Sequence, residues 1–144
     1  MELKRFVKVD ANGNDLPNDA PTWPAFRSLA TGVIWAVDEL ARMSHAEATA
    51  AAATTDVAGG FGRLATLAEF EADVVDRERA EPAINDEVRY LAPGFDAGAF
   101  WTSSPDVSAP DYAWFVLLNY GGVNLFSRDD RLRVRVVRSA VPSQ

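Results

Sequence analysis

The sequence contains no cysteine and a single histidine among its 144 residues. The absence of cysteine excludes disulfides, zinc sites built on thiolates and a cysteine nucleophile. Apolar runs are also short: the longest, such as residues 33–37 and 112–118, fall far below the roughly 20 residues that cross a bilayer. No signal-peptide pattern is visible at the start of the chain. We therefore expect a protein that is made in a cytoplasm and has no membrane partner.

Positive charge is scarce in the middle of the chain. The net charge is −7, and residues 38–111 carry fifteen acidic and five basic side chains, whereas residues 127–144 carry two acidic and five basic ones. A basic tail can form a nucleic-acid patch, but the acidic body would repel phosphate, and the usual DNA-binding motifs have no match here. We therefore expect no nucleic-acid partner.

Two capping boxes predict two helices. In a capping box a hydroxyl side chain accepts from the backbone N–H three residues on, and a glutamate at that position reaches back to the first residue. The pairs are Ser44 with Glu47 and Thr66 with Glu69, which predict helices over residues 44–54 and 66–77. In the second helix Leu67, Phe70 and Val74 are spaced for one buried face. We expect two helices in all, both in the first half of the chain.

Short segments rich in β-branched and aromatic residues predict the strands. Two are expected before the helices, at residues 4–9 and 30–37, and three after residue 100, at 113–119, 123–126 and 132–137. Glycines in the segment 120–122 are typical of a hairpin turn between two of them. Apolar side chains alternate with arginines along the last strand, which indicates one buried and one solvated face. The arginines of this predicted solvated face are Arg131, Arg133 and Arg135. The order of elements is typical of an α+β fold.

Several of these segments together resemble one known family, the Lcl C-terminal domain family. In the family's order they are Thr31-Gly32-Val33-Ile34-Trp35, residues 62–70, Pro82-Ala83-Ile84-Asn85, residues 100–105, residues 112–116 and residues 134–138. The resemblance covers about residues 26–138. Two positions depart from the family's pattern, since Gly62 stands where an aromatic residue is usual and Ala65 where proline is usual.

The resemblance implies a C-type-lectin-like fold in which two helices pack on short antiparallel strands. We expect a single domain over residues 1–144, with an N-terminal strand and loop over residues 1–25 and a family-like core over residues 26–138. Members of the family occur in phage and bacterial adhesive or receptor-binding proteins, so the resemblance implies a scaffold for binding and no shared enzymatic activity. It also assigns Arg135 and Arg138 to the fold, where either could stack over Trp101 or Trp114.

The side chains that could support catalysis or bind metal have simpler explanations. His45 lies one residue inside the first predicted helix, where a histidine is normally solvated, and the cap already accounts for Ser44 and Glu47 beside it. Carboxylates cluster over residues 69–81, but arginines are interleaved with them and no loop has the ligand spacing of a calcium site. We interpret them as a solvated acidic face, and we expect no catalytic residue, no metal, no cofactor and hence no enzyme. The carboxylates are Glu69, Glu71, Asp73, Asp76, Glu78 and Glu81.

A candidate binding face surrounds the predicted hairpin turn. Trp101, Trp114 and Phe115 fit the core of the sheet, whereas Tyr120 and Phe126 flank the turn, where the core pattern ends. Tyrosine, asparagine and arginine are favoured at binding surfaces because they offer contact area and adaptable hydrogen bonds. The predicted binding residues are Asn119, Tyr120, Asn124, Phe126, Arg128 and Arg131.

Three hypotheses for function follow. The first is a recognition domain of phage or prophage type that binds a protein or glycan through the surface over residues 103–133. The second is an intracellular inhibitor or accessory protein that binds a host protein complex through the acidic segment 66–111, because acidic surfaces are steered to basic clefts. The third is a structural subunit of a virion fibre, which would make the chain a virion-associated homo-oligomer.

Overall fold

The structure, a computed structural model, describes residues 1–104 and 110–139. Strands predominate within these residues, together with three short helices: α1 (His45–Ala53), α2 (Leu67–Asp73) and α3 (Asp86–Leu91). None of these helices has the length and apolar character that a membrane crossing requires. The fold is thus a mixed α and β one in which strands form the greater part, as the α+β prediction requires.

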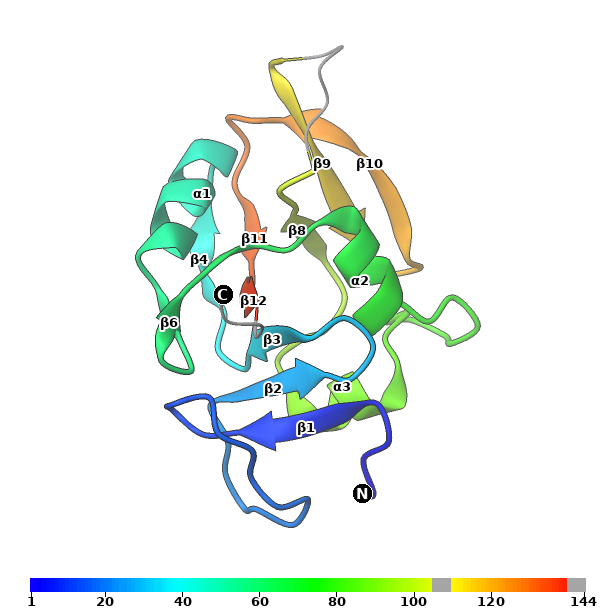
Figure 1. The fold of residues 1–144 in the computed structure, drawn as a ribbon. Helices are drawn as coiled ribbons and strands as arrows, with labels where there is room; N and C mark the ends of the chain where they lie inside the picture. The colour runs from blue at the N-terminus through cyan, green and yellow to red at the C-terminus, as the bar shows by residue number, and fades with distance from the viewer. Residues whose placement is uncertain (105–109, 140–144) are drawn as a thin grey trace.

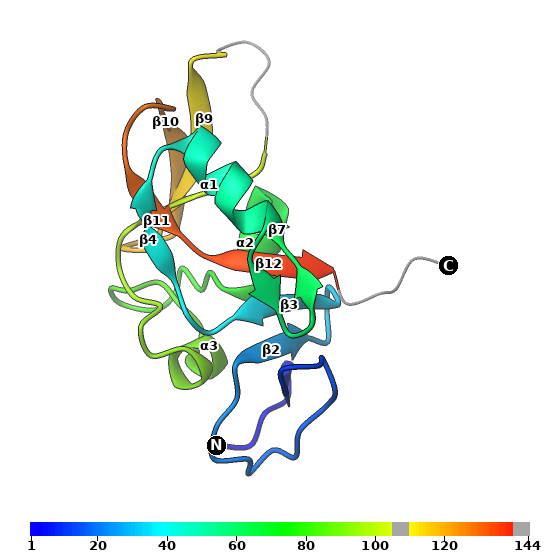
Figure 2. The same cartoon turned by 90° about the vertical axis from the view of Figure 1, so that its left-hand side faces the viewer.

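Two five-stranded sheets form the frame of the molecule (Figure 1). The first has the order β1 (Phe6–Val9), β2 (Ala25–Ser28), β3 (Val33–Ala36), β12 (Val136–Ser139) and β7 (Arg63–Leu64). The second has the order β10 (Gly122–Ser127), β9 (Tyr112–Leu117), β8 (Ala99–Trp101), β11 (Leu132–Val134) and β4 (Leu40–Met43). A small hairpin of β5 (Asp56–Val57) and β6 (Gly60–Phe61) is separate from both. In both cartoon views β1 and β2 lie at one end of the molecule and the β9–β10 hairpin at the other (Figures 1 and 2).

Both predicted capping boxes are present. Ser44 and Thr66 each accept from the backbone N–H of the glutamate three residues on, and each glutamate accepts from the cap residue in return. The second helix ends at Asp73 rather than near Arg77, because the chain becomes extended there: Val75 forms a β-bridge with Ile84. The expectation of two helices is wrong, since α3 follows Asn85, whose side chain accepts from the Val88 N–H at 3.0 Å.

The last predicted strand, residues 132–137, is in fact two strands in two different sheets. β11 lies between β8 and β4, whereas β12 lies between β3 and β7. The chain therefore passes through the middle of the molecule, and every residue from 132 to 137 is buried. The predicted solvated face is wrong for Arg133 and Arg135, and only Arg131 of the three arginines is exposed.

Glu39 explains how two arginines are buried next to each other. Arg133 donates from Nε and Nη2 to the two carboxylate oxygens of Glu39 at 2.8 and 2.7 Å. Arg135, which is 1% exposed, donates from Nη2 to the same carboxylate at 3.1 Å. Burial lowers the pKa of Arg135 to about 10, so the guanidinium remains charged at neutral pH. A half-buried carboxylate and two buried guanidinium groups thus hold the loop before β4 against β11.

The structural role expected of the two family-like arginines agrees with their contacts, but the ring partner is different. The Arg135 guanidinium lies 4.1 Å from the ring centroid of Phe95, not over Trp101 or Trp114. Arg138 donates instead to the backbone carbonyl oxygens of Val57 and Ala58. These contacts tie the C-terminal part of the described chain to the loop after α3 and to the β5–β6 hairpin.

The hydrophobic core has two parts, one on each side of the first sheet. The larger part contains the rings of Trp35, Phe70, Phe95 and Phe100, which pack against α2 and α3. The smaller part lies under α1 and contains Ile34, Ala48, Ala52, Trp101 and Val134. Trp101 is therefore a core residue, as predicted, whereas Trp114 and Phe115 are only half-buried.

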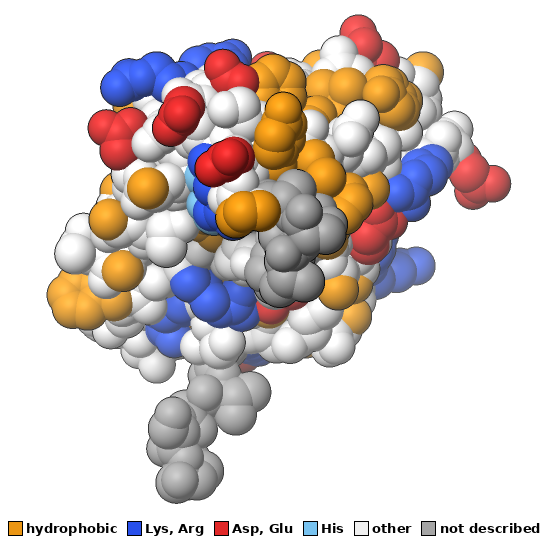
Figure 3. Space-filling view, turned by 90° about the horizontal axis from the view of Figure 1, so that it is seen from above, with side chains coloured by type: hydrophobic (Ala, Val, Ile, Leu, Met, Phe, Trp, Pro, Cys, Tyr) orange, Lys and Arg blue, Asp and Glu red, His pale blue; other side chains and the backbone are white. Residues whose placement is uncertain are grey.

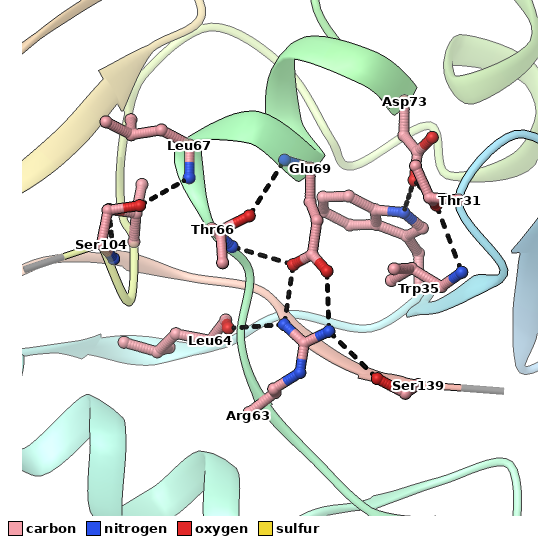
Figure 4. Close-up of polar contacts among 12 residues, drawn as sticks. Thr31, Trp35, Arg63, Leu64, Thr66, Leu67, Glu69, Asp73, Ser104 and Ser139 are labelled. Carbon is pink, nitrogen blue, oxygen red and sulfur yellow. Dashed lines mark hydrogen bonds and ion pairs between the residues drawn. The ribbon is translucent and has the colours of Figure 1, made fainter. Parts of the chain in front are cut away.

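Asp73, the last residue of α2, joins this helix to the first sheet (Figure 4). Its side chain is 1% exposed and accepts from Ser28 Oγ at 2.7 Å, from Thr31 Oγ1 at 2.7 Å and from Trp35 Nε1 at 2.8 Å. A carboxylate withdrawn from water needs such donors to compensate for lost hydration. Asp73 is thus a buried anchor and not part of the solvated acidic face that the sequence predicts.

A second carboxylate fastens the start of α2 (Figure 4). Arg63 on β7 donates from Nη1 and Nη2 to the two oxygens of Glu69, each at 2.7 Å, and the Thr66 N–H donates to the same side chain at 2.9 Å. Burial opposes ionisation of Glu69, but the hydrogen bonds from Arg63 and Thr66 outweigh it and lower the pKa of this carboxyl. Both ends of α2 are therefore held by carboxylates that bind donors from the first sheet.

Replacing Asp73 should destabilise the protein strongly. Asp73→Ala leaves the buried donors of Ser28 and Trp35 without their acceptor, at about 1–3 kcal/mol for each group, so we expect a loss of at least about 2 kcal/mol in the free energy of unfolding. Urea denaturation followed by circular dichroism measures it. Glu71→Ala is the matched control on the same helix, because it breaks only the surface ion pair with Arg77, worth less than about 1 kcal/mol. Equal losses for the two variants would contradict the anchor role.

Candidate binding surface

The β9–β10 hairpin consists of an inner strand, β9, that packs against the core and an outer strand, β10, that is more exposed. Ala113 and Val116 of β9 and Leu118 just after it are fully buried, whereas no residue of β10 is. β10 is therefore held in place chiefly by its pairing with β9, whose register runs from Gly122↔Leu117 to Ser127↔Tyr112. Seen from this end of the molecule, hydrophobic side chains gather on the surface (Figure 3).

The turn that joins β9 to β10 has the predicted glycine, and side chains of residues 77 and 81 form hydrogen bonds with it. Gly121 has a φ of 82°, which glycine adopts without strain. Its carbonyl accepts from Arg77 Nη2 at 2.7 Å, and the Asn119 side-chain amide donates to Glu81 at 2.9 Å. Tyr120 stands at the top of the turn and is 66% exposed. Of the two predicted turn residues, Tyr120 is therefore available to a partner, while Asn119 is held by Glu81.

Asn124 and Phe126 lie on one face of β10. Their partners in the register are Phe115 and Ala113, so all four side chains share that face of the sheet. Phe126 is 40% exposed, and its ring meets that of Phe115 edge to face at 5.5 Å. Asn124 is exposed, and its Oδ1 accepts from the Leu125 N–H at 2.8 Å.

The two predicted arginines lie beyond the other end of β10 and differ in their surroundings. Arg131 is exposed, with Glu47 at 3.6 Å. Arg128 is half-buried, and its Nη1 lies 3.0 Å from Nδ1 of His45. Because a strand of six residues is about 20 Å long, the predicted residues form a strip along β10 rather than one compact patch. Residues 105–109 of the proposed 103–133 surface lie outside the described residues.

The sequence analysis missed a second exposed set on the opposite face of the hairpin. Tyr112 and Val123 are large exposed apolar residues, and Trp114 and Leu125 between them are half-buried. In the register Val123 pairs with Val116 and Leu125 with Trp114, so they share a face. Residues 112–117 are apolar throughout, so the sequence carries no alternation that could have assigned Tyr112 to the surface.

His45 is buried, so the prediction of a solvated surface histidine is wrong. The first turn of α1 packs on β8, where the His45 ring meets Trp101 edge to face at 5.2 Å. Its Nε2 lies 2.8 Å from the Thr102 carbonyl oxygen, which accepts, and its Nδ1 faces the Arg128 guanidinium, which only donates. This pair of neighbours assigns a neutral ring with the proton on Nε2. Burial lowers the pKa of His45, and the charge of Arg128 lowers it further against a raising effect of the Thr102 carbonyl.

Most carboxylates of the acidic segment 66–111 are engaged rather than free. Besides Asp73 and Glu69, Glu71 pairs with Arg77, Asp86 with Arg79, and Asp96 with Arg133. Glu87 accepts from the backbone N–H groups of Lys4 and Arg5. Within residues 1–104 and 110–139 no group of three or more histidine, aspartate or glutamate side chains is placed to hold a metal ion.

Comparison with known proteins gives one match. The model of the Lcl C-terminal domain matches residues 25–138. No curated protein and no solved structure matches the chain. The matched region begins at β2 and ends within β12, so it includes both carboxylate anchors of α2 and the whole β9–β10 hairpin.

The neutral state of His45 predicts a pH dependence of stability. The unfolded chain takes up a proton near the ordinary histidine pKa of about 6.5, whereas the folded chain resists it. The stabilisation is therefore complete above that pH and is lost as pH falls through the lowered pKa of the folded state, with a slope of at most about 1.4 kcal/mol per pH unit. Urea denaturation at successive pH values between neutral and mildly acidic measures the slope.

His45→Gln is the control for this dependence, because it removes the titrating group and keeps an amide that can reach Thr102. We expect its free energy of unfolding to be nearly constant over the same pH range. The pKa of Glu69 is lowered and so lies below this window. A slope that survives in His45→Gln would show that another group is responsible.

Proposed function

The chain belongs to the Lcl C-terminal domain family, and on this basis we propose that it is a non-enzymatic recognition domain of phage or prophage origin. It binds a protein or glycan partner through the β9–β10 hairpin. The binding residues are those of the exposed strip, with Tyr120 and Phe126 as aromatic contacts and Asn124 and Arg131 as polar ones.

One observation carries the proposal: large apolar side chains are exposed together on a hairpin whose base is rigid. Tyr112, Tyr120, Val123 and Phe126 account for four of the exposed large hydrophobic residues among those described, and all lie within one hairpin. Tyr112 and Val123 lie on one face of the hairpin and Phe126 on the other, with Tyr120 in the turn. Exposed apolar side chains can mark interaction sites in soluble domains. Buried residues of β9 hold the hairpin, so its surface is largely preformed for a partner.

The buried polar side chains support a structural rather than a catalytic role for the rest of the molecule. The His45 ring lies between the Thr102 carbonyl and the Arg128 guanidinium. Asp73 accepts hydrogen bonds from three side chains, and Glu39 accepts from two arginines. Each of these groups is already occupied by neighbours that position strands and helices. An acidic-surface inhibitor is supported less well, because the carboxylates of its segment are mostly paired with arginines or backbone N–H groups.

A structural subunit of a virion fibre is the second candidate function. The observation that favours it is the outer edge of β10, which pairs with no other strand of residues 1–104 and 110–139. A free edge of this kind can bind another chain.

Paired substitutions on the hairpin should weaken recognition without unfolding the protein. The domain is immobilised and used to capture ligands from a bacterial cell-envelope extract and from a glycan panel, and the affinity for each captured ligand is then measured. Tyr120→Ala with Asn124→Ala removes an exposed aromatic contact and a polar one, so we expect affinity to fall about tenfold or more. Phe61→Ala is the control, because Phe61 is 73% exposed on β6, outside the hairpin. Unchanged capture by the double variant would refute the proposed surface.

A further inference from the structure

β10 is the end strand of the second sheet. Its inner side pairs with β9 over all six residues without a register shift. Within the described part of the chain its outer side has no neighbouring strand. Such an edge presents a row of N–H and C=O groups that a further strand can pair with.

The register shows which residues point their backbone groups outward. The Trp114 carbonyl accepts from the Thr102 N–H at 3.2 Å, on the side of β9 that faces away from β10, so Leu125 opposite Trp114 also points away from β9. At the next inward position the Arg128 N–H donates to the Asp111 carbonyl at 2.9 Å, which gives the same alternation. The outward residues of β10 are therefore Val123, Leu125 and Ser127.

β10 lacks the features that usually protect a sheet edge. Charged residues, proline or a bulge normally prevent unwanted pairing, but the segment GVNLFS contains no charge and no proline, and its register is regular. Of the other end strands of the two sheets, β4 and β7 include a basic residue, Arg42 and Arg63. The outer side of β1 is covered, because the Leu16 N–H donates to the Lys8 carbonyl and Val9 forms a bridge with Asp15. Among the described residues, the acceptor of the Leu125 N–H is the Asn124 side chain, which can turn away.

We propose that β10 pairs with β10 of a second copy of this chain, antiparallel about a two-fold axis at Leu125. In this register Leu125 faces Leu125 of the second copy, and Val123 faces Ser127. The outward residues of one copy thus meet the outward residues of the other, which is the self-complementarity that a two-fold interface requires. The Leu125 pair exchanges two hydrogen bonds, and each Ser127 N–H reaches a Val123 carbonyl.

The paired segment itself is free of charge. The six residues of β10 include no acidic and no basic side chain, so two chains of net charge −7 can meet along this edge without placing like charges opposite each other.

The paired strands would extend both faces of the hairpin. Leu125 and Val123 lie on the face that carries Trp114, so this apolar strip becomes continuous across the axis. Asn124 and Phe126 of both copies lie on the other face, which duplicates the proposed binding residues. The inference goes beyond the proposed function and does not rest on it, because the pairing uses the backbone edge and no ligand.

Sedimentation equilibrium of the full chain tests the pairing. We expect a dimer at high concentration that dissociates on dilution. Leu125→Pro should be monomeric, because proline removes an N–H that points away from β9 and so spares the hairpin ladder. Leu125→Lys is a second disruptive variant, since it places two like charges opposite each other. Phe61→Ala is the control and should remain dimeric, although it removes a more exposed apolar side chain.

Cysteine cross-linking tests the register, because the chain has no cysteine of its own. Leu125→Cys places two Cα atoms about 5.5 Å apart across the axis, within the range that a disulfide spans. In the same register, residue 124 of one copy lies opposite residue 126 of the second copy. The two cysteines of Asn124→Cys are therefore offset by two residues, and their Cα atoms are farther apart than the roughly 7 Å limit. We expect rapid oxidation to a covalent dimer for Leu125→Cys and much slower oxidation for Asn124→Cys.

Three results would overturn the proposal: a wild-type chain that stays monomeric or forms a trimer, a dimer that survives both Leu125→Pro and Leu125→Lys, or equal cross-linking at positions 124 and 125. Circular dichroism of each variant confirms that the domain is folded. The recognition function is judged separately: a monomeric Leu125→Pro that still captures ligand leaves recognition standing, and a dimer that captures none leaves the pairing standing.

Discussion

A buried carboxylate at the end of α2 is the constraint on which the rest of the structure depends. Asp73 gathers donors from β2, from the turn after it and from β3, and so fixes the helix on the first sheet. Charge-assisted hydrogen bonds of this kind are strong and directional. The helix in turn places Phe70 in the same core as Val116 of β9. The buried carboxylate is therefore connected to the inner strand of the hairpin through the core that Phe70 and Val116 share.

Local signals in the sequence were sufficient for the elements that depend on neighbours in the chain. Ser44 and Thr66 cap the predicted helices, and Gly121 forms the predicted turn. Elements that depend on distant partners were missed or misjudged. Alternating arginines indicate a solvated face, but Arg133 is buried because Glu39, 94 residues earlier, neutralises it. The break between β11 and β12 at Arg135 also depends on distant residues. The two strands pair with different sheets, and both sheets contain segments from far earlier in the chain.

The candidate site divides along the same line. Tyr120, Asn124, Phe126 and Arg131 are exposed as predicted, because turn chemistry and alternation are local. Asn119 and Arg128 are engaged by Glu81 and His45, which lie far away in the sequence. The segments that carry the family resemblance include Thr31, Trp35, Arg63 and Glu69, all members of the hydrogen-bond network around α2. These residues of the resemblance therefore belong to the scaffold, although the matched region also includes the hairpin.

The path of the final strands has a consequence for how the protein is made. β11 lies between β8 and β4, and β12 lies between β3 and β7, so each sheet receives an interior strand from residues 132–139. Neither sheet can be completed until this segment has left the ribosome. Until then β8, β4, β3 and β7 each have an edge without its partner strand. A chain interrupted before residue 132 would expose the flanks of both gaps to chaperones and proteases. Both sheets are thus completed only at the end of synthesis, after the strands of the hairpin have been made.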